Sequence, residues 1–394
     1  MFRLKYIWGA LLGLASISSA HPSEDELIAL GRSLVVKPWV AAPAATTARD
    51  GLGPLFSANS CVACHKKLGS SPAQENARIL DRSYIVKLIN DGGGDPRYGL
   101  QLSPNGTAQV AAEARVRVNY QEVLFRYPDG HAVKLRKPEY ELSQLAYGPL
   151  HQETTISVRQ TPSLATVAMI EKIPDSWILA QGNKKYRGIK GQLPKSYNGK
   201  LGRYSWKSES FSLNEQIAKA LIFDMGLTSS QFPQDDCRPI QKSCVLHAHN
   251  ETLDVPDMRL EAIALFLKSL NEGREIKAAS GEGAKLFTKL ACAACHVTQK
   301  AIPSDAFQTV YSDMLLHFMG DGLKDPGPAN LAGLWRTAPL IDNKSKAAFL
   351  HDGRGRTIEE AILWHGGDAE ESKLAFTRLN YRQRQELIKF LEAL

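Results

Sequence analysis

The sequence predicts a mainly α-helical protein of two tandem units, and three observations support this prediction. The pentapeptide Cys-x-x-Cys-His occurs twice, at residues 61–65 and 292–296. Each predicted unit ends in an amphipathic run, residues 260–270 and 383–394, whose apolar residues recur at the helical spacings of three and four. The length of 394 residues is enough for two or three domains with a complete core.

Composition and charge narrow the class of protein. Apolar residues make up 43% and charged residues 23% of the chain, which is typical of globular proteins and excludes collagen, coiled coil and low-complexity disorder. The net charge is +7, and two of the positive charges, Arg3 and Lys5, lie in a segment that we expect to be removed. The remaining excess is spread over a long chain, so we expect no nucleic-acid partner.

Residues 1–20 have the pattern of a signal peptide. A basic start is followed by a mostly apolar run over residues 6–17 and by small residues up to Ala20. An uncleaved anchor is the alternative, but about twelve apolar residues are too few to span a bilayer. We therefore expect a mature protein that begins near His21, is exported to the periplasm and does not span the membrane.

The two pentapeptides have the spacing of c-type haem attachment sites. Two thiols three residues apart on one turn can each bond a vinyl group of the porphyrin, and the adjacent imidazole can bind the iron. The predicted attachment residues are Cys61, Cys64, Cys292 and Cys295, and the predicted iron ligands are His65 and His296. A shared zinc site and a thioredoxin-like redox pair are the alternatives. The long separation of the motifs disfavours the first, and the lack of a strand and helix pattern around them disfavours the second.

The remaining cysteines, Cys237 and Cys244, enclose a short loop. In an exported chain such a pair is expected to form a structural disulfide. A redox-active pair is the alternative, although nothing nearby in the sequence would activate the thiolates.

A local repeat supports two cytochrome c-like domains. Leu55-Phe56 and Leu286-Phe287 stand at the same distance before the first cysteine of each motif, which predicts an apolar helix end before both. We expect the domains at residues 21–272 and 273–394, joined by the polar segment 271–280. The first domain contains a long insertion with a β-hairpin, because alternating apolar residues flank a turn at residues 128–130.

Several motifs carry a family resemblance. EEAILWHGGD occupies residues 359–368 after FLHDGRGRT, YELSQLAYGPL begins at Tyr140, DMGLTS at Asp224 and YSDMLLHFMGDGL at Tyr311. On these motifs the chain resembles, over nearly its whole mature length, the di-haem oxidoreductase family, which is often labelled thiol oxidoreductase or peroxidase. That family is related to bacterial di-haem cytochrome c peroxidases.

The resemblance implies a sixth iron ligand in the second unit. In the related peroxidases the residue fourteen places after the His of a His-x-Gly segment fills this position, and counting from His351 reaches His365. Thr357 and Glu360 predict a capping box at the start of a helix that Gly366-Gly367 ends, so His365 would lie at the helix terminus. An ordinary helix-end cation is the alternative role of His365. The rival ligands are Met314, His317 and Met319.

The first haem is expected to keep one iron position open. Many relatives supply a His shortly after the first motif, but this chain has no His between His65 and His131. Peroxide reduction also needs a group that moves a proton between the two oxygens. By resemblance to a pattern after a Trp, Glu215 is the candidate catalytic residue here. The alternative is a first-turn helix carboxylate after Ser212.

Other residues carry weaker expectations. By resemblance, His351, Arg354 and Arg356 are expected near haem propionates, and Trp335 lies in a segment like that between the haems of the relatives. The relatives hold calcium largely through backbone carbonyls, which leave no signature in the sequence, so calcium is an open expectation here.

Together these features predict a periplasmic di-haem oxidoreductase of the peroxidase type. A small cytochrome or copper protein would deliver electrons to the His296/His365 haem, and they would pass to the His65 haem, where peroxide or another small substrate is reduced. The alternatives are an electron carrier without turnover and an oxidase of a protein or small molecule.

Overall fold

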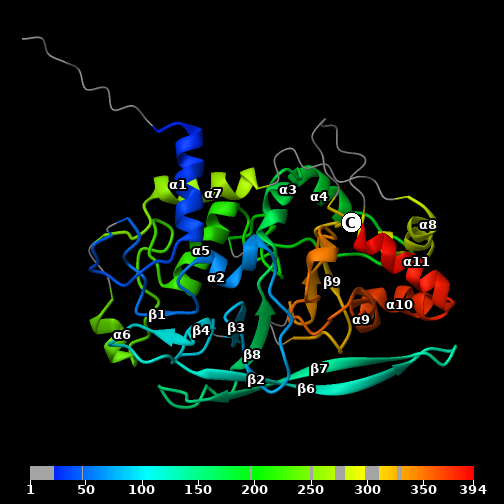
Figure 1. Ribbon diagram of the computed structural model, residues 1–394, viewed down its shortest axis with the longest axis horizontal. Helices are drawn as coiled ribbons and strands as arrows, with labels where there is room; N and C mark the ends of the chain where they lie inside the picture. The colour runs from blue at the N-terminus through cyan, green and yellow to red at the C-terminus, as the bar shows by residue number, and fades with distance from the viewer. Residues whose placement is uncertain are drawn as a thin grey trace, which may run out of the picture.

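The structure is a computed structural model that describes residues 22–46, 48–91, 93–195, 198–248, 252–270, 280–297, 310–325 and 331–394 (Figure 1). The predicted signal peptide and nearly all of the predicted linker lie outside these residues.

Short helices and strands are interspersed along the chain. The helices are α1 (Glu24–Val36), α2 (Cys61–Cys64), α3 (Val167–Glu171), α4 (Asp175–Gly182), α5 (Leu213–Met225), α6 (Lys242–Leu246), α7 (Asp257–Ser269), α8 (Glu282–Lys289), α9 (Ile358–Trp364), α10 (Glu370–Thr377) and α11 (Tyr381–Glu392). The strands are β1 (Leu55–Phe56), β2 (Arg78–Ile79), β3 (Tyr84–Ile89), β4 (Gln101–Leu102), β5 (Asn105–Gly106), β6 (Arg115–Arg126), β7 (Ala132–Ser143), β8 (Thr155–Gln160), β9 (Leu316–Phe318) and β10 (Leu334–Arg336).

The prediction of a mainly α-helical fold is wrong. The structure is 32% helical and 19% strand, with several small sheets. The missed strands include β3, which alternates buried and half-buried residues and pairs with β8 about seventy positions later in the chain. Pairing over such a distance leaves no local period, so the sequence pattern predicted α7 and α11 but not this sheet.

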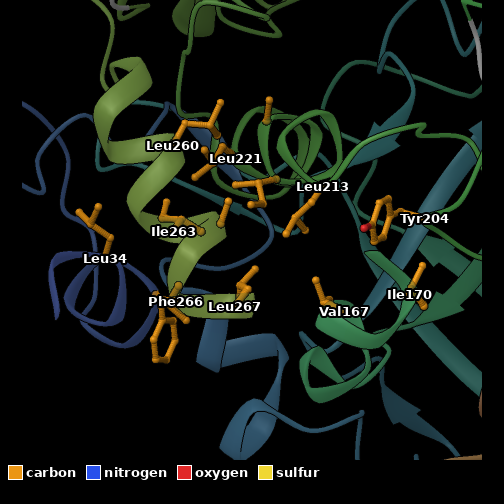
Figure 2. Close-up of a cluster of buried hydrophobic side chains, with 14 of the residues drawn as sticks. Leu34, Val167, Ile170, Tyr204, Leu213, Leu221, Leu260, Ile263, Phe266 and Leu267 are labelled. Carbon is orange, nitrogen blue, oxygen red and sulfur yellow. The ribbon is translucent and has the colours of Figure 1, made fainter. Parts of the chain in front are cut away.

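Helices α1, α5 and α7 pack around an apolar core (Figure 2). Leu34 of α1, Leu221 of α5 and Ile263 of α7 are buried there. At Gly31 a Cβ atom would lie 1.9 Å from the carbonyl oxygen of Ala262, so a glycine is needed for α1 and α7 to approach this closely. This core supports the segment that contains the first pentapeptide, because Cys61 packs against it.

The predicted β-hairpin is confirmed as β6 and β7, which pair antiparallel along their whole length. Its outer end reaches the C-terminal half of the chain, as Figure 1 shows for the long pair of strands. There the Tyr127 hydroxyl donates to Glu359 at 2.8 Å, and the buried Arg384 pairs with Asp129 at 2.7 Å. The insertion therefore connects both halves of the molecule.

The C-terminal half has its own apolar core between α8 and α11. Phe287 of α8 and Phe390 of α11 are buried with ring centroids 5.3 Å apart, and Leu387 is fully buried beside them. Tyr127 and Leu135 of the hairpin are part of the same cluster. The second pentapeptide follows directly from α8.

The sequence repeat before the two pentapeptides does not adopt the same secondary structure at both positions. Leu286 and Phe287 lie in helix α8, as expected, but Leu55 and Phe56 form strand β1, which pairs with β5. The expectation of a helix end before the first motif is therefore wrong. The difference comes from the pairing with β5, about fifty positions later in the chain, which leaves no local signal in the sequence. Just before β1 the chain is packed closely against Gly226, because a Cβ atom at Gly53 would lie 2.4 Å from the Gly226 carbonyl oxygen.

Two further expectations can be compared with the structure. Cys237 and Cys244 form a disulfide, as predicted. Among the described residues, no helix has both the length and the apolar character needed to cross a bilayer.

Candidate functional site

The first pentapeptide forms the one-turn helix α2, with His65 at its C-terminal end. Both thiols are free, and the Cys64 sulfur lies 2.9 Å from the carbonyl oxygen of Arg82. Burial, and then the Asp224 carboxylate, raise the pKa of the Cys61 thiol to about 12, and the same two causes raise that of Cys64. Both side chains are therefore neutral thiols, not a reactive thiolate pair.

His65 presents one ring nitrogen to the space beside this turn. Its Nδ1 donates to the carbonyl oxygen of Pro162 at 2.7 Å, since a carbonyl can only accept. The neutral ring therefore keeps its lone pair on Nε2. Burial lowers the pKa of His65 to about 4, which keeps this nitrogen unprotonated at neutral pH. An imidazole in this state is a suitable metal ligand.

The second pentapeptide repeats this arrangement on a 3₁₀ turn, Cys292–Ala294. Burial raises the pKa of the Cys292 thiol to about 12 and also raises that of Cys295. The Nδ1 of His296 donates to the carbonyl oxygen of Tyr311 at 3.0 Å, so Nε2 is again the free nitrogen. Burial, and next the nearby His365, lower the pKa of His296 to about 4.

His365 lies at the C-terminal end of α9, as predicted, and its Nδ1 donates to the carbonyl oxygen of Ala361 at 2.6 Å. His296 and His365 line the same cavity as Cys292 and Cys295. The structure therefore brings the predicted ligand pair of the second haem into one space, with a free Nε2 on each ring.

The predicted capping box at α9 is incomplete. The Thr357 side chain accepts from the backbone N–H of Glu360, but the Glu360 carboxylate binds Arg356 at 2.7 Å. This ion pair engages Arg356, which is one of the two arginines expected near the haem propionates. The second, Arg354, is paired with Asp352 at 2.7 Å.

Among the rival ligands, His317 has both ring nitrogens engaged. Its Nε2 lies 2.8 Å from Asp313 and its Nδ1 lies 3.4 Å from Asp368. Burial alone would lower the pKa of His317, but hydrogen bonds to these two carboxylates raise it to about 12. His317 is thus a charged donor to carboxylates, and its ring nitrogens are both occupied, unlike those of His296 and His365. Met319 lines the cavity, whereas Met314 is fully buried.

Trp335 and His351 line the same cavity and stack on each other. Their ring centroids are 3.7 Å apart at an angle of 14°, and burial lowers the pKa of His351 to about 4. Lys346 also lines this cavity, and its ammonium donates to Asn343 at 2.8 Å and to the Pro339 carbonyl at 3.3 Å. Calcium binding stays a prediction.

Glu215 lies in the first turn of α5, after the Ser212 cap. One carboxylate oxygen accepts from the backbone N–H of Phe211 at 2.8 Å, and the other pairs with Lys219 at 2.9 Å. These contacts are those expected for the alternative role of Glu215, a helix carboxylate in the first turn after Ser212. No contact among the described residues joins Glu215 to the first pentapeptide, and its catalytic role stays a prediction.

Asp224, on the same helix, is a functional candidate that sequence reasoning missed. Its backbone carbonyl accepts from Ser57 and Ala58, just before the first motif, and its carboxylate influences the pKa of both thiols there. Gln101 donates to the carboxylate at 2.7 Å. Burial raises the pKa of Asp224, although Lys87 and Gln101 offset part of this effect.

Helix geometry separates the two carboxylates. Nine residues are about 2.5 helical turns, so Asp224 and Glu215 point to opposite sides of α5. The side chain that faces the first motif is that of Asp224. A sequence signal existed, because the motif DMGLTS was recognised as part of the family resemblance, but its first residue was given no role.

The residues present fit two c-type haems. At each pentapeptide two free thiols lie beside an imidazole whose outer nitrogen is held by a backbone carbonyl. His65, His296 and His365 are all only partly buried by accessible surface, yet the surrounding protein lowers the pKa of each ring. His296 and His365 face the cavity that both of them line.

Of the comparisons with known proteins, the family comparison agrees with this fit. A family model described as "Di-haem oxidoreductase, putative peroxidase" matches residues 103–394. No curated protein matches the chain. Among solved structures, the chain is similar to one described as "Kuenenia stuttgartiensis Hydrazine Synthase Pressurized with 20 bar Xenon", with 14% identity, complete coverage of both chains and a TM-score of 0.37.

Proposed function

Because the chain belongs to the di-haem oxidoreductase family, we propose that it is an exported, peroxidase-type enzyme that holds one covalently attached c-type haem at each pentapeptide. The observation that carries this proposal is the repeated local arrangement of His65 and His296. In both, Nδ1 donates to a backbone carbonyl and Nε2 is left for iron, beside two protonated thiols.

The two sites are proposed to do different work. When bound, the haems supply electron transfer and an iron that can take a small oxidant. His296 and His365 would together hold the iron of the second haem, which would leave no position for a substrate and would favour the oxidised state compared with methionine ligation. At the first haem His65 would be the protein ligand, and a substrate could take the remaining position. We therefore place electron entry at the second site and the substrate at the first.

The chain must also supply protons where the substrate binds. Reduction of hydrogen peroxide breaks the O–O bond and consumes two electrons and two protons to give two waters. Asp224 suits this task, because burial raises its pKa and so increases the fraction of carboxyl that carries a proton. Gln101 orients the carboxyl from one side. Glu215 is the alternative proton carrier.

Two matched substitutions test this assignment. Asp224→Asn should lower the rate of peroxide reduction by about 10²-fold or more, because the amide cannot donate and recover a proton. Glu215→Gln should retain most of the rate. The measurement is peroxide consumption by the holoprotein, driven by a small reductant, with haem content checked by mass and absorbance. Full activity in Asp224→Asn together with loss in Glu215→Gln would return the role to Glu215.

The physiological donor is proposed to be a small cytochrome or copper protein, and the compartment the periplasm. If the holoprotein carries two porphyrins but consumes no peroxide, the electron-carrier alternative replaces the enzyme.

A further inference from the structure

A strongly basic stretch lies beside the second site. Between Asp175 and Glu209 the chain contains no acidic residue. The basic residues of this stretch are Lys184, Lys185, Arg187, Lys190, Lys195, Lys200, Arg203 and Lys207. The part that follows α4, residues 183–190, is exposed except for the half-buried Ile189, and is called the basic loop below.

The basic loop is held by the segment just before the second pentapeptide and by strand β9. Arg187 donates to the carbonyl oxygen of Lys289 at 3.2 Å, three residues before Cys292. Just after the loop, Gln192 exchanges backbone hydrogen bonds of 2.8 and 2.9 Å with Leu316 of β9. Ile189 lines the cavity that contains Cys292 and His365. The loop therefore forms part of the rim of this cavity.

Close backbone approach holds the loop in place. At Gly191 a Cβ atom would lie 2.6 Å from the Leu315 Cβ and 2.7 Å from the His317 Nε2. A larger residue would push the loop away from β9. The position of the positive charges relative to the second site is thus set by the fold and not by a free surface segment.

The charges of the loop are presented to solvent. Lys184, Lys185, Arg187 and Lys190 are exposed, as is Lys289 of α8, and none of them forms an ion pair with a carboxylate among the described residues. A solvated face is the plain alternative. However, concentrated like charges repel one another, so an uncompensated cluster at the rim of a redox site is explained better by a partner of opposite charge.

We propose that the basic loop and Lys289 form the docking surface for a small electron-transfer protein whose redox centre is surrounded by acidic side chains. In each encounter the partner loses one electron to the centre held by His296, and no proton needs to move. The inference deepens the proposed function, on which it rests, by assigning the charge of the donor and the place where it binds. Exposed Tyr186, with Arg187 over its ring at 5.7 Å, adds the side-chain types that are enriched in interfaces.

The test uses rapid mixing of the chemically reduced holoprotein with an oxidised plastocyanin, a small copper protein with an acidic face. This reaction runs in the reverse direction and passes through the same docked complex. Mitochondrial cytochrome c, which is basic, serves as the opposite-charge partner. The rate with plastocyanin should fall about tenfold or more between about 10 and 200 mM salt, because screening removes the attraction. Cytochrome c should react more slowly and show no such fall.

A charge-reversed variant, Lys184→Glu/Lys185→Glu/Lys190→Glu, should slow plastocyanin about tenfold or more at low salt. The matched control, Arg126→Glu/Lys137→Glu/Lys242→Glu, changes the net charge equally at exposed positions elsewhere and should leave most of the rate intact. Equal slowing in both variants, or no slowing in the first, would overturn the proposed docking surface. So would loss of binding to phosphatidylglycerol vesicles in the loop variant with an unchanged plastocyanin rate, because the loop would then be a membrane-binding element.

Peroxide reduction driven by a small neutral reductant separates this inference from the proposed function. If the loop variant keeps that activity, its slow reaction with plastocyanin reports docking alone. If wild-type protein lacks that activity, the peroxidase assignment fails, while the plastocyanin rates still decide the docking surface.

Discussion

At the scale of single residues, His365 and His317 lie beside the same motif but differ in the state of their rings. His365 has one nitrogen free, whereas both nitrogens of His317 are held by carboxylates. Replacing His365 by Ala should convert the second haem from low spin to high spin, or to ligation by Met319 in the same cavity. The matched variant His317→Gln should keep the wild-type spectrum. Magnetic circular dichroism of the oxidised holoproteins measures both, and an unchanged spectrum in His365→Ala removes this residue from the iron.

Glu113 makes the stability of the fold depend on pH. It is buried, accepts from Ser103 and Gln241, and burial raises its pKa to about 8. The folded state therefore binds this proton more tightly than the unfolded state, whose carboxyl has its usual pKa of about 4.5. The contribution of Glu113 to stability is present below that value and is lost as the pH rises toward 8.

The substitution Glu113→Gln should make the free energy of unfolding depend less on pH between about pH 5 and pH 8, since an amide does not titrate. Chemical unfolding between about pH 5 and pH 8 measures the free energy of unfolding, and the slope should fall in Glu113→Gln but not in the exposed control Glu153→Gln. If the free energy of unfolding falls equally with pH in the wild type and in Glu113→Gln, the pH dependence comes from groups other than Glu113.

The residue scale also defines what the sequence could predict. Six site residues follow from the local pattern of the two pentapeptides. His365 follows from its position fourteen residues after His351, at the end of one helix. The role of Asp224 was not predicted, because its burial and its contact with Gln101 depend on strands from distant parts of the chain. Glu215 was proposed from a resemblance to a local motif, and the Ser212 cap predicted its alternative role as a first-turn helix carboxylate.

At the scale of elements, the β6–β7 hairpin connects the two halves of the molecule. Arg136 of β7 is buried and donates to three carbonyl groups, those of Gln74 at 2.7 Å, Arg354 at 2.8 Å and Gly353 at 2.9 Å. The turn and the alternation of β6 and β7 were predictable, since both are local. The hydrogen bonds from Arg136 to Arg354 and Gly353 were not predictable, because they join residues more than two hundred positions apart.

Arg136→Met should therefore destabilise the protein by about 3 kcal/mol, because three buried carbonyl groups lose their donor. Lys137→Met, at the exposed neighbouring position, should change stability by less than about 0.5 kcal/mol. Urea unfolding of both variants provides the comparison. Similar midpoints for the two would mean that the hairpin does not brace the C-terminal half.

At the scale of the whole molecule, the prediction of a mainly α-helical fold failed because most of the described helices are short and the described residues between 78 and 160 form strands and loops. Only α1, α5, α7 and α11 exceed ten residues. The sequence nevertheless predicted the cofactor class, since covalent haem attachment requires a local motif and not a particular layering of helices and sheets. The two halves share cores and ion pairs through the hairpin, so each site is held by residues from both parts of the chain.

Electron paramagnetic resonance of the oxidised holoprotein, before and after addition of cyanide, tests the central claim most directly. We predict one low-spin ferric signal from the site of His296 and His365 and one high-spin signal of equal intensity from the site of His65. Cyanide should convert only the high-spin signal. Two low-spin signals that cyanide leaves unchanged, or a protein without haem iron, would contradict the account.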